Sequence, residues 1–126
     1  MSAAPGAVRL AVAPIAWRND DIEEISELYS VADCLRESVE AGYVGTEAGR
    51  SYPRDPAQLK ELLDAAGIVM ASGWWSGMLR TGTVEDEIAR IDAELRLYEG
   101  VGADIMFYGE IDGSVQAASE PLSRRP

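Results

Sequence analysis

The stretch Asp55 to Ser72, DPAQLKELLDAAGIVMAS, contains a complete helix signal followed by a complete strand signal. Asp55 is a suitable N-cap, and Pro56 fits the first helical position, where no backbone N–H is needed. Leucine and alanine recur at helical spacing through the segment, and Gly67 ends the helix. The apolar run Ile68 to Ser72 then predicts a strand buried on both faces.

The same order of helix, glycine and apolar strand occurs twice more along the chain. A helix from Ser30 to Gly42 precedes a strand from Tyr43 to Glu47, and a helix from Thr83 to Gly102 precedes a strand from Ala103 to Tyr108. The three exits from helix to strand have the sequences AGYVG, AGIVM and VGADI. An apolar run from Val8 to Ala16 predicts a first strand ahead of these units.

This alternation predicts right-handed βαβ units around a parallel sheet. Four strands with three crossover helices fit either a small open α/β sheet or the first half of an eight-stranded (β/α) barrel of about 250 residues. The segment Ile111 to Pro126 is polar and irregular and offers no helix to cover the fourth strand. We therefore interpret residues 1–126 as the N-terminal half of a barrel, a truncated chain with an irregular tail at 111–126.

The composition restricts the chemistry and the partners of this chain. Its 126 residues include 11 Lys and Arg against 22 Asp and Glu, and the net charge of −11 disfavours nucleic acid and membrane surfaces as partners. Cys34 is the one cysteine, so no intrachain disulfide can form, which favours a cytoplasmic protein. There is no histidine, so any reactive groups must be carboxylates, hydroxyls, amides and aromatic faces.

The ends of the predicted strands carry the candidate binding residues. In parallel α/β folds ligands bind at the carboxyl ends of the strands. Carboxylates and amides there can hydrogen-bond the hydroxyls of a polyhydroxylated ring, and an indole can cover its C–H surface. The predicted substrate-binding residues are Trp17, Asn19, Glu47, Trp74, Glu110 and Gln116.

Each of these residues also has a purely structural interpretation. Trp17 and Trp74 can equally close the mouth of the barrel as aromatics at the edge of the core. Glu47 favours a functional role more strongly, because a carboxylate at a buried strand end is unfavourable unless it is paired or used. We interpret Asp20 and Asp21 as a solvated turn and not as a metal loop.

Four separated motifs carry further information: PIAWRNDD (14–21), CLRESVEAGYVGTEAGRSYPRDP (34–56), MASGWWSG (70–77) and YGEIDGSVQ…PLSRRP (108–126). In this order they resemble the N-terminal part of the inosose dehydratase family. The resemblance implies a xylose isomerase-like TIM barrel about twice as long as this chain, or longer. It also implies a lyase of inositol catabolism that dehydrates 2-keto-myo-inositol (scyllo-inosose) to a trihydroxycyclohexane-1,2-dione. Manganese or cobalt is the implied metal cofactor, and glutathione is associated with the activity.

The resemblance places the metal-binding carboxylates and histidine on later strands, so no metal ligand is expected in this chain and the catalytic base is unassigned. The chain alone is expected to be inactive, with a ketoinositol or related small polyol as its partner. Two other functions stay open. One is a sugar isomerase or epimerase of the same barrel superfamily, and the other is a non-catalytic polyol-binding or assembly module.

A half barrel is also expected to form a homo-oligomer or to aggregate. Its free edges would be Val8 to Ala13 and Ala103 to Tyr108, both apolar and able to pair with another strand. The side chains expected on exposed apolar surface are Leu10, Val12, Val69, Ile105 and Phe107.

Overall fold

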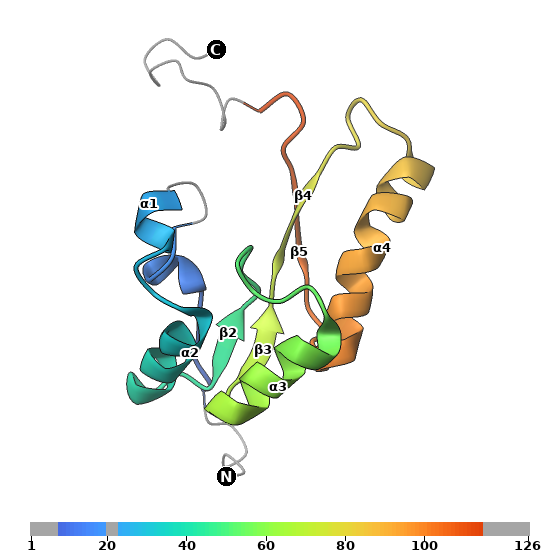
Figure 1. Ribbon diagram of the computed structural model, residues 1–126. Helices are drawn as coiled ribbons and strands as arrows, with labels where there is room; N and C mark the ends of the chain where they lie inside the picture. The colour runs from blue at the N-terminus through green and yellow to red at the C-terminus, as the bar shows by residue number, and fades with distance from the viewer. Residues whose placement is uncertain (1–7, 20–22, 115–126) are drawn as a thin grey trace.

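The computed structural model describes residues 8–19 and 23–114, which form parallel strands flanked by helices (Figure 1). Every strand pairing is parallel. Because β4 follows β3 directly after Gly73, these two strands share one position in the array, and we call the resulting four positions tracks. The strands are β1 (Ala11–Val12), β2 (Gly45–Glu47), β3 (Val69–Ser72), β4 (Trp74–Gly77) and β5 (Phe107–Glu110).

The four tracks lie side by side in the order of the sequence. One sheet has the order β1-β2-β3, and β4 pairs with β5. The crossover helices α2 (Val31–Glu40), α3 (Pro56–Ala66) and α4 (Val84–Val101) pack consecutively, α2 on α3 and α3 on α4. In a doubly wound sheet the strand order reverses at a switch point, whereas in a barrel each new strand is added on the same side of the previous one. The sequential order confirms parallel (β/α) units forming about half of a TIM barrel.

The helix boundaries follow from local capping chemistry, as the sequence predicts. Ser30 accepts from the Asp33 backbone N–H at 3.1 Å, and the Asp33 carboxylate accepts from the Ser30 N–H, which completes a capping box. Asp55 and Thr83 cap α3 and α4 by accepting from the backbone N–H groups of Gln58 and Asp86. Helices α3 and α4 end on Gly67 and Gly102, both left-handed, a conformation that glycine adopts without strain.

The core lies between the strands and the helices. Its side chains come from α2, α3, α4, the strand entries and the segment after β2, so one apolar layer joins all three units. Cys34 on α2 is 1% exposed, and burial raises the pKa of its thiol. The core residues are Leu35, Tyr52, Leu59, Leu63, Ile68, Met70, Leu97 and Tyr98.

The first strand is much shorter than the predicted Val8 to Ala16. Of that run, only Ala11–Val12 forms a strand, which pairs with β2, and the Val44 N–H also donates to the Leu10 carbonyl at 3.0 Å. Pro14 then starts a 3-10 helix, η1 (Pro14–Ala16), because proline lacks the N–H that a strand ladder needs and its φ suits a helical turn.

Four residues beyond the end of the predicted third strand form a further strand, β4 (Trp74–Gly77). It pairs residue by residue with β5, Trp74 opposite Phe107 and Gly77 opposite Glu110. The fourth strand is correspondingly displaced: it begins at Phe107 and not at Ala103. Ala103 cannot pair there because its N–H closes the end of α4 by donating to the Tyr98 carbonyl at 2.9 Å. A short helix, α1 (Glu23–Ser26), precedes α2 and is not among the elements predicted from the sequence.

One side of the strands has no helix over it, and we call it the uncovered face: Ala11, Gly45, Val69, Ala71, Trp74 and Phe107. The predicted exposure of Leu10, Val69, Ile105 and Phe107 is confirmed, because each is 53 to 59% exposed. Val12 is half-buried, since it pairs with the buried Thr46 on the helix-covered side.

Candidate functional site

Glu47 ends β2 and lies beside a hollow of about 380 Å³. The pairing between β2 and β3 shifts register after Thr46, and the Ala48 N–H then donates to the Ser72 carbonyl at 2.8 Å, which fixes the backbone around Glu47. Within the described part of the chain, the half-buried carboxylate of Glu47 makes no hydrogen bond or ion pair. We call this hollow the Glu47 pocket, lined by Ala13, Pro14, Ile15, Glu47, Ala48, Gly49 and Trp74.

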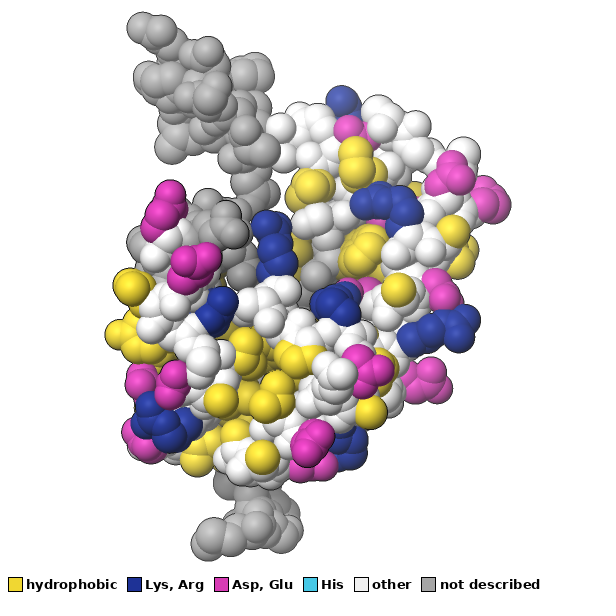
Figure 2. All heavy atoms as spheres, viewed as in Figure 1, with side chains coloured by type: hydrophobic (Ala, Val, Ile, Leu, Met, Phe, Trp, Pro, Cys, Tyr) yellow, Lys and Arg dark blue, Asp and Glu magenta, His cyan; other side chains and the backbone are white. Residues whose placement is uncertain are grey.

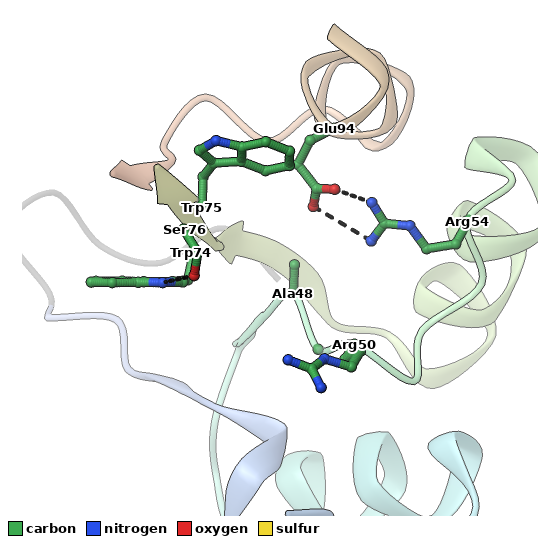
Figure 3. Close-up of a pocket in the computed structure, with 8 residues that line it drawn as sticks. Ala48, Arg50, Arg54, Trp74, Trp75, Ser76 and Glu94 are labelled. Atoms are coloured by element: carbon green, nitrogen blue, oxygen red, sulfur yellow. Dashed lines mark hydrogen bonds and ion pairs between the residues drawn. The ribbon is translucent and has the colours of Figure 1, made fainter. Parts of the chain in front are cut away.

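Trp74 forms another wall of the Glu47 pocket. Its indole ring lies against β5, where a Cβ on Gly109 would overlap the ring, so only glycine permits this approach. The indole N–H donates to the Ser76 hydroxyl oxygen at 3.0 Å (Figure 3). Trp74 is 53% exposed, so an aromatic ring that the Ser76 contact holds in place lies open to solvent beside the Glu47 carboxylate.

A second hollow of about 340 Å³ adjoins the first and shares Ala48, Gly49 and Trp74 with it. Arg54, in the segment between β2 and α3, forms an ion pair with Glu94 of α4 across this second hollow (Figure 3). Glu94 is 7% exposed, so the pair neutralises a carboxylate that would otherwise be buried without a counter-charge.

Trp75 points away from Trp74 and links β4 to α4 by a hydrogen bond (Figure 3). Its indole N–H donates to Glu87 Oε1 at 2.6 Å, and the Arg90 guanidinium donates to Glu87 Oε2 at 2.6 Å while lying 5.6 Å from the indole centroid. The hydrogen bond from Trp75, and secondarily the positive charge of Arg90, lower the pKa of the buried Glu87 carboxyl.

Two predicted site residues lie outside both hollows. Trp17 donates its indole N–H to Glu37 Oε2 of α2 at 2.7 Å, so its polar end is directed at a helix. The Asn19 backbone carbonyl accepts a hydrogen bond from the Ser26 hydroxyl of α1. The structure therefore does not bring Trp17 and Asn19 together with Glu47, and their binding role stays a prediction.

Glu110 lies at the carboxyl end of β5, as predicted, but its oxygens are engaged by the chain itself. Oε2 accepts from the Leu79 N–H at 2.8 Å, and Oε1 accepts from the Asp112 N–H at 3.1 Å. These contacts hold the connection between β4 and α4 against the end of β5. Gln116, the sixth predicted residue, lies outside the described residues.

Sequence reasoning missed the ion pair of Arg54 with Glu94 and the cluster around Glu87. A signal for both was present in α4, because Glu87 and Glu94 are spaced by two helical turns and share a face with Tyr98. A carboxylate within the apolar stripe of a helix predicts a hydrogen-bond or ion-pair partner in the core, because a buried carboxylate without a partner is unfavourable.

The described residues contain neither a metal-ligand cluster nor a membrane-spanning helix. In residues 8–19 and 23–114, no three or more Asp, Glu or Cys side chains lie together in a way that could hold an ion. No helix in the same ranges has the length and apolar character needed to cross a bilayer.

The sequence is similar to proteins of inositol and rhizopine catabolism. It is 39% identical to the rhizopine catabolism protein MocC of Rhizobium meliloti over 94% of this chain, and 36% identical to the inosose dehydratase of Klebsiella pneumoniae (strain 342) over 91%. The inosose dehydratase of Geobacillus thermodenitrificans is 34% identical over 90%. The chain spans 37 to 38% of the length of these three relatives. No protein-family model matches it.

A solved structure supports the fold independently of sequence. The crystal structure of an AP endonuclease, family 2, from Brucella melitensis superposes with a TM-score of 0.60 at 11% identity, over 81% of this chain and 40% of that one. The resemblance to inosose dehydratases, inferred above from four motifs, is thus confirmed over about nine tenths of the chain.

Proposed function

We propose that this chain supplies the ketoinositol-binding wall of an inosose dehydratase, as the N-terminal part of a barrel of that kind. The observation that carries the proposal is the unengaged, half-buried carboxylate of Glu47 beside the exposed ring of Trp74 at the strand ends. This pairing suits a polyhydroxylated ring, and it occurs in a chain that is similar to proteins named inosose dehydratase.

In the proposed reaction, 2-keto-myo-inositol loses one water. A C–H bond next to the ketone breaks, a double bond forms, and the hydroxyl on the following carbon leaves with the proton as water. Glu47 accepts hydrogen bonds from substrate hydroxyls and thereby orients the ring. This contact contributes to catalysis to the extent that it strengthens as charge develops on the substrate.

Trp74 and Ser76 complete the binding wall in this proposal. The Trp74 ring covers the C–H surface of the substrate and excludes water from that side. Ser76 Oγ already accepts from the Trp74 indole, so its hydroxyl hydrogen is available to donate to a substrate oxygen.

A divalent metal, implied by the family resemblance, does not fit the described residues as a complete centre. In the described residues Glu47 belongs to no group of three or more side chains that could hold a metal ion, and both Glu110 oxygens accept from backbone N–H groups. We therefore assign no step of the reaction to a metal held by these residues.

A ligand titration tests the proposal on the chain itself. Intrinsic tryptophan fluorescence, with ligand-observed NMR as a second readout, should report binding of scyllo-inosose near the exposed Trp74. Glu47→Gln should weaken binding about 10-fold, equivalent to about 1.4 kcal/mol. Glu61→Gln, an exposed position on α3, is the matched control and should bind like the unaltered chain.

The same titration separates the competing functions. Tighter binding of a linear aldose than of scyllo-inosose would favour a sugar isomerase or epimerase. Equal binding by the chain and by Glu47→Gln would remove Glu47 from the site and contradict the proposal.

A further inference from the structure

The second hollow, of about 340 Å³, is rich in hydrogen-bond donors. Arg50 and Arg54 lie on one side of it, across from Trp74 and Trp75 (Figure 3). Each guanidinium has five N–H donors and no acceptor. Ser76 also lines the hollow, and its hydroxyl hydrogen is available because the oxygen accepts from the Trp74 indole. A ligand in this hollow therefore meets mostly donors.

The carboxylate of Glu94 adds little acceptor capacity, because both of its oxygens are already engaged. Oε1 accepts from Arg54 Nη1 at 3.5 Å, and Oε2 accepts from Arg54 Nη2. Glu94 is also buried, so a ligand reaches little of it. The second hollow differs in this respect from the Glu47 pocket, and it favours a ligand that brings acceptor oxygens of its own.

The contact with Glu94 holds Arg54 ready for a second partner. Within residues 8–19 and 23–114, Glu94 is the one acceptor that Arg54 contacts, and the Arg54 side chain is 52% exposed. The remaining donors include Nε–H beside an Nη–H, a planar fork that matches two oxygens of a carboxylate or phosphate. Because the buried carboxylate already orients this guanidinium, binding a second group costs it less rotamer freedom.

The charges around the second hollow also favour an anion. Its lining carries the positive charges of Arg50 and Arg54 against the negative charge of Glu94, although the whole chain has a net charge of −11. Figure 2 shows Lys and Arg side chains near the centre of one face, with most Asp and Glu side chains toward its margins. Local positive charge in an acidic protein concentrates anions at that place.

We propose that the second hollow binds an oxyanion, a carboxylate or a phosphate group. Arg54 donates to two of its oxygens through the fork that Glu94 leaves unused, and the Ser76 hydroxyl donates to another oxygen. Glu94 positions Arg54 and does not touch the ligand. Arg50 contributes its positive charge and needs no direct contact. This site goes beyond the proposed function, because scyllo-inosose carries no charge.

The oxyanion has two possible sources, a free ion or an acidic group attached to a ring polyol. The two hollows share Ala48, Gly49 and Trp74. Since Ala48 and Gly49 have little or no side chain, a ring in the Glu47 pocket has a way to extend an acidic group into the second hollow. This second source rests on the proposed function, whereas the anion site itself does not.

Titration of the 126-residue chain with inorganic phosphate at constant ionic strength tests the site. Phosphorus NMR and tryptophan fluorescence should both report saturable binding. Arg54→Lys keeps a positive charge beside Glu94 but removes the fork, and it should weaken phosphate binding about 5-fold. Arg96→Lys makes the same change at an exposed position on α4 and should bind like the unaltered chain. Circular dichroism shows that each variant is folded.

Glu94→Gln changes phosphate binding in the opposite direction. The amide oxygen still accepts from Arg54, but the negative charge that repels the anion is gone, so phosphate should bind about 3-fold more tightly. Glu61→Gln, an exposed position on α3, is the matched control and should leave the affinity unchanged. An ion pair with a purely structural role would give no such gain.

Glucuronate, a ring polyol that bears a carboxylate, distinguishes the two sources. If the acidic group belongs to a ligand in the Glu47 pocket, both Glu47→Gln and Arg54→Lys weaken glucuronate binding. If the anion is a free ion, only Arg54→Lys does so. Glu47→Gln should not weaken phosphate binding in either case, so a failure of the proposed function is distinguishable from a failure of the anion site.

Three results would overturn the anion site. They are the absence of saturable phosphate binding by the unaltered chain, equal phosphate affinity of folded Arg54→Lys and the unaltered chain, and no gain in affinity in Glu94→Gln.

Discussion

Gly73 joins β3 to β4 at a point where no side chain fits. A Cβ there would overlap the Tyr98 hydroxyl and lie 2.8 Å from the Ala48 Cβ. We expect Gly73→Ala to lower the free energy of unfolding by about 2 kcal/mol, as overpacking of a tight contact does. Urea unfolding followed by circular dichroism measures this change.

The double variant Gly73→Ala/Tyr98→Phe identifies the cause of that loss. The Tyr98 hydroxyl is buried with no hydrogen-bond partner in the described structure, so its removal leaves no donor or acceptor unsatisfied. Part of the lost stability should return in the double variant. Full stability of the single variant would contradict the tight contact between β4 and α4.

The ionisation of Glu87 is coupled to the fold. Its carboxyl accepts from Trp75 and Arg90, and these contacts hold its pKa below the ordinary value of 4.5. Because the folded pKa lies below the unfolded one, ionised Glu87 stabilises the fold above about pH 4.5, and the contribution is lost as pH falls through the folded pKa.

Glu87→Gln should therefore destabilise the chain at pH 7 and reduce its loss of stability on acidification. Urea unfolding at a series of pH values from 7 to about 3 measures the effect. Glu85→Gln, exposed on the same helix, should keep the pH dependence of the unaltered chain. Parallel profiles for Glu87→Gln and the unaltered chain would show that the Trp75 contact does not couple ionisation to folding.

At the scale of a single element, α2 depends on its first turn. It has ten residues, a marginal length for an isolated helix, and its capping box satisfies N–H groups that would otherwise lack partners. Ser30→Ala should lower the free energy of unfolding by about 1 kcal/mol. Ser30→Thr keeps the hydroxyl and should lose much less; equal losses in both variants would assign the effect to something other than the cap.

At the scale of the whole molecule, the chain is expected not to dehydrate scyllo-inosose by itself. The described residues do not group three ligands around Glu47, so added manganese or cobalt should not restore activity. Incubation with either metal, followed by chromatographic detection of the dione, measures this. Dione formation above the buffer rate would contradict the expectation and place the complete reaction within this chain.

The sequence alone determined the features that depend on neighbours a few residues away. The caps at Ser30, Asp55 and Thr83 and the glycine exits of α3 and α4 are local hydrogen-bond and backbone effects, so they could be predicted. The alternation of helix and strand followed from them, and so did the position of Glu47 at a strand end.

Only the tertiary structure decided the features that depend on distant partners. The segment Trp74 to Gly77 is a strand because β5, about 30 residues later, supplies its hydrogen bonds. Trp17 is directed at Glu37, and Glu110 at Leu79, through contacts that no local pattern encodes. Long-range pairing overrides local propensity in such places, because one strand or indole can satisfy its groups in several ways and the assembled fold selects among them.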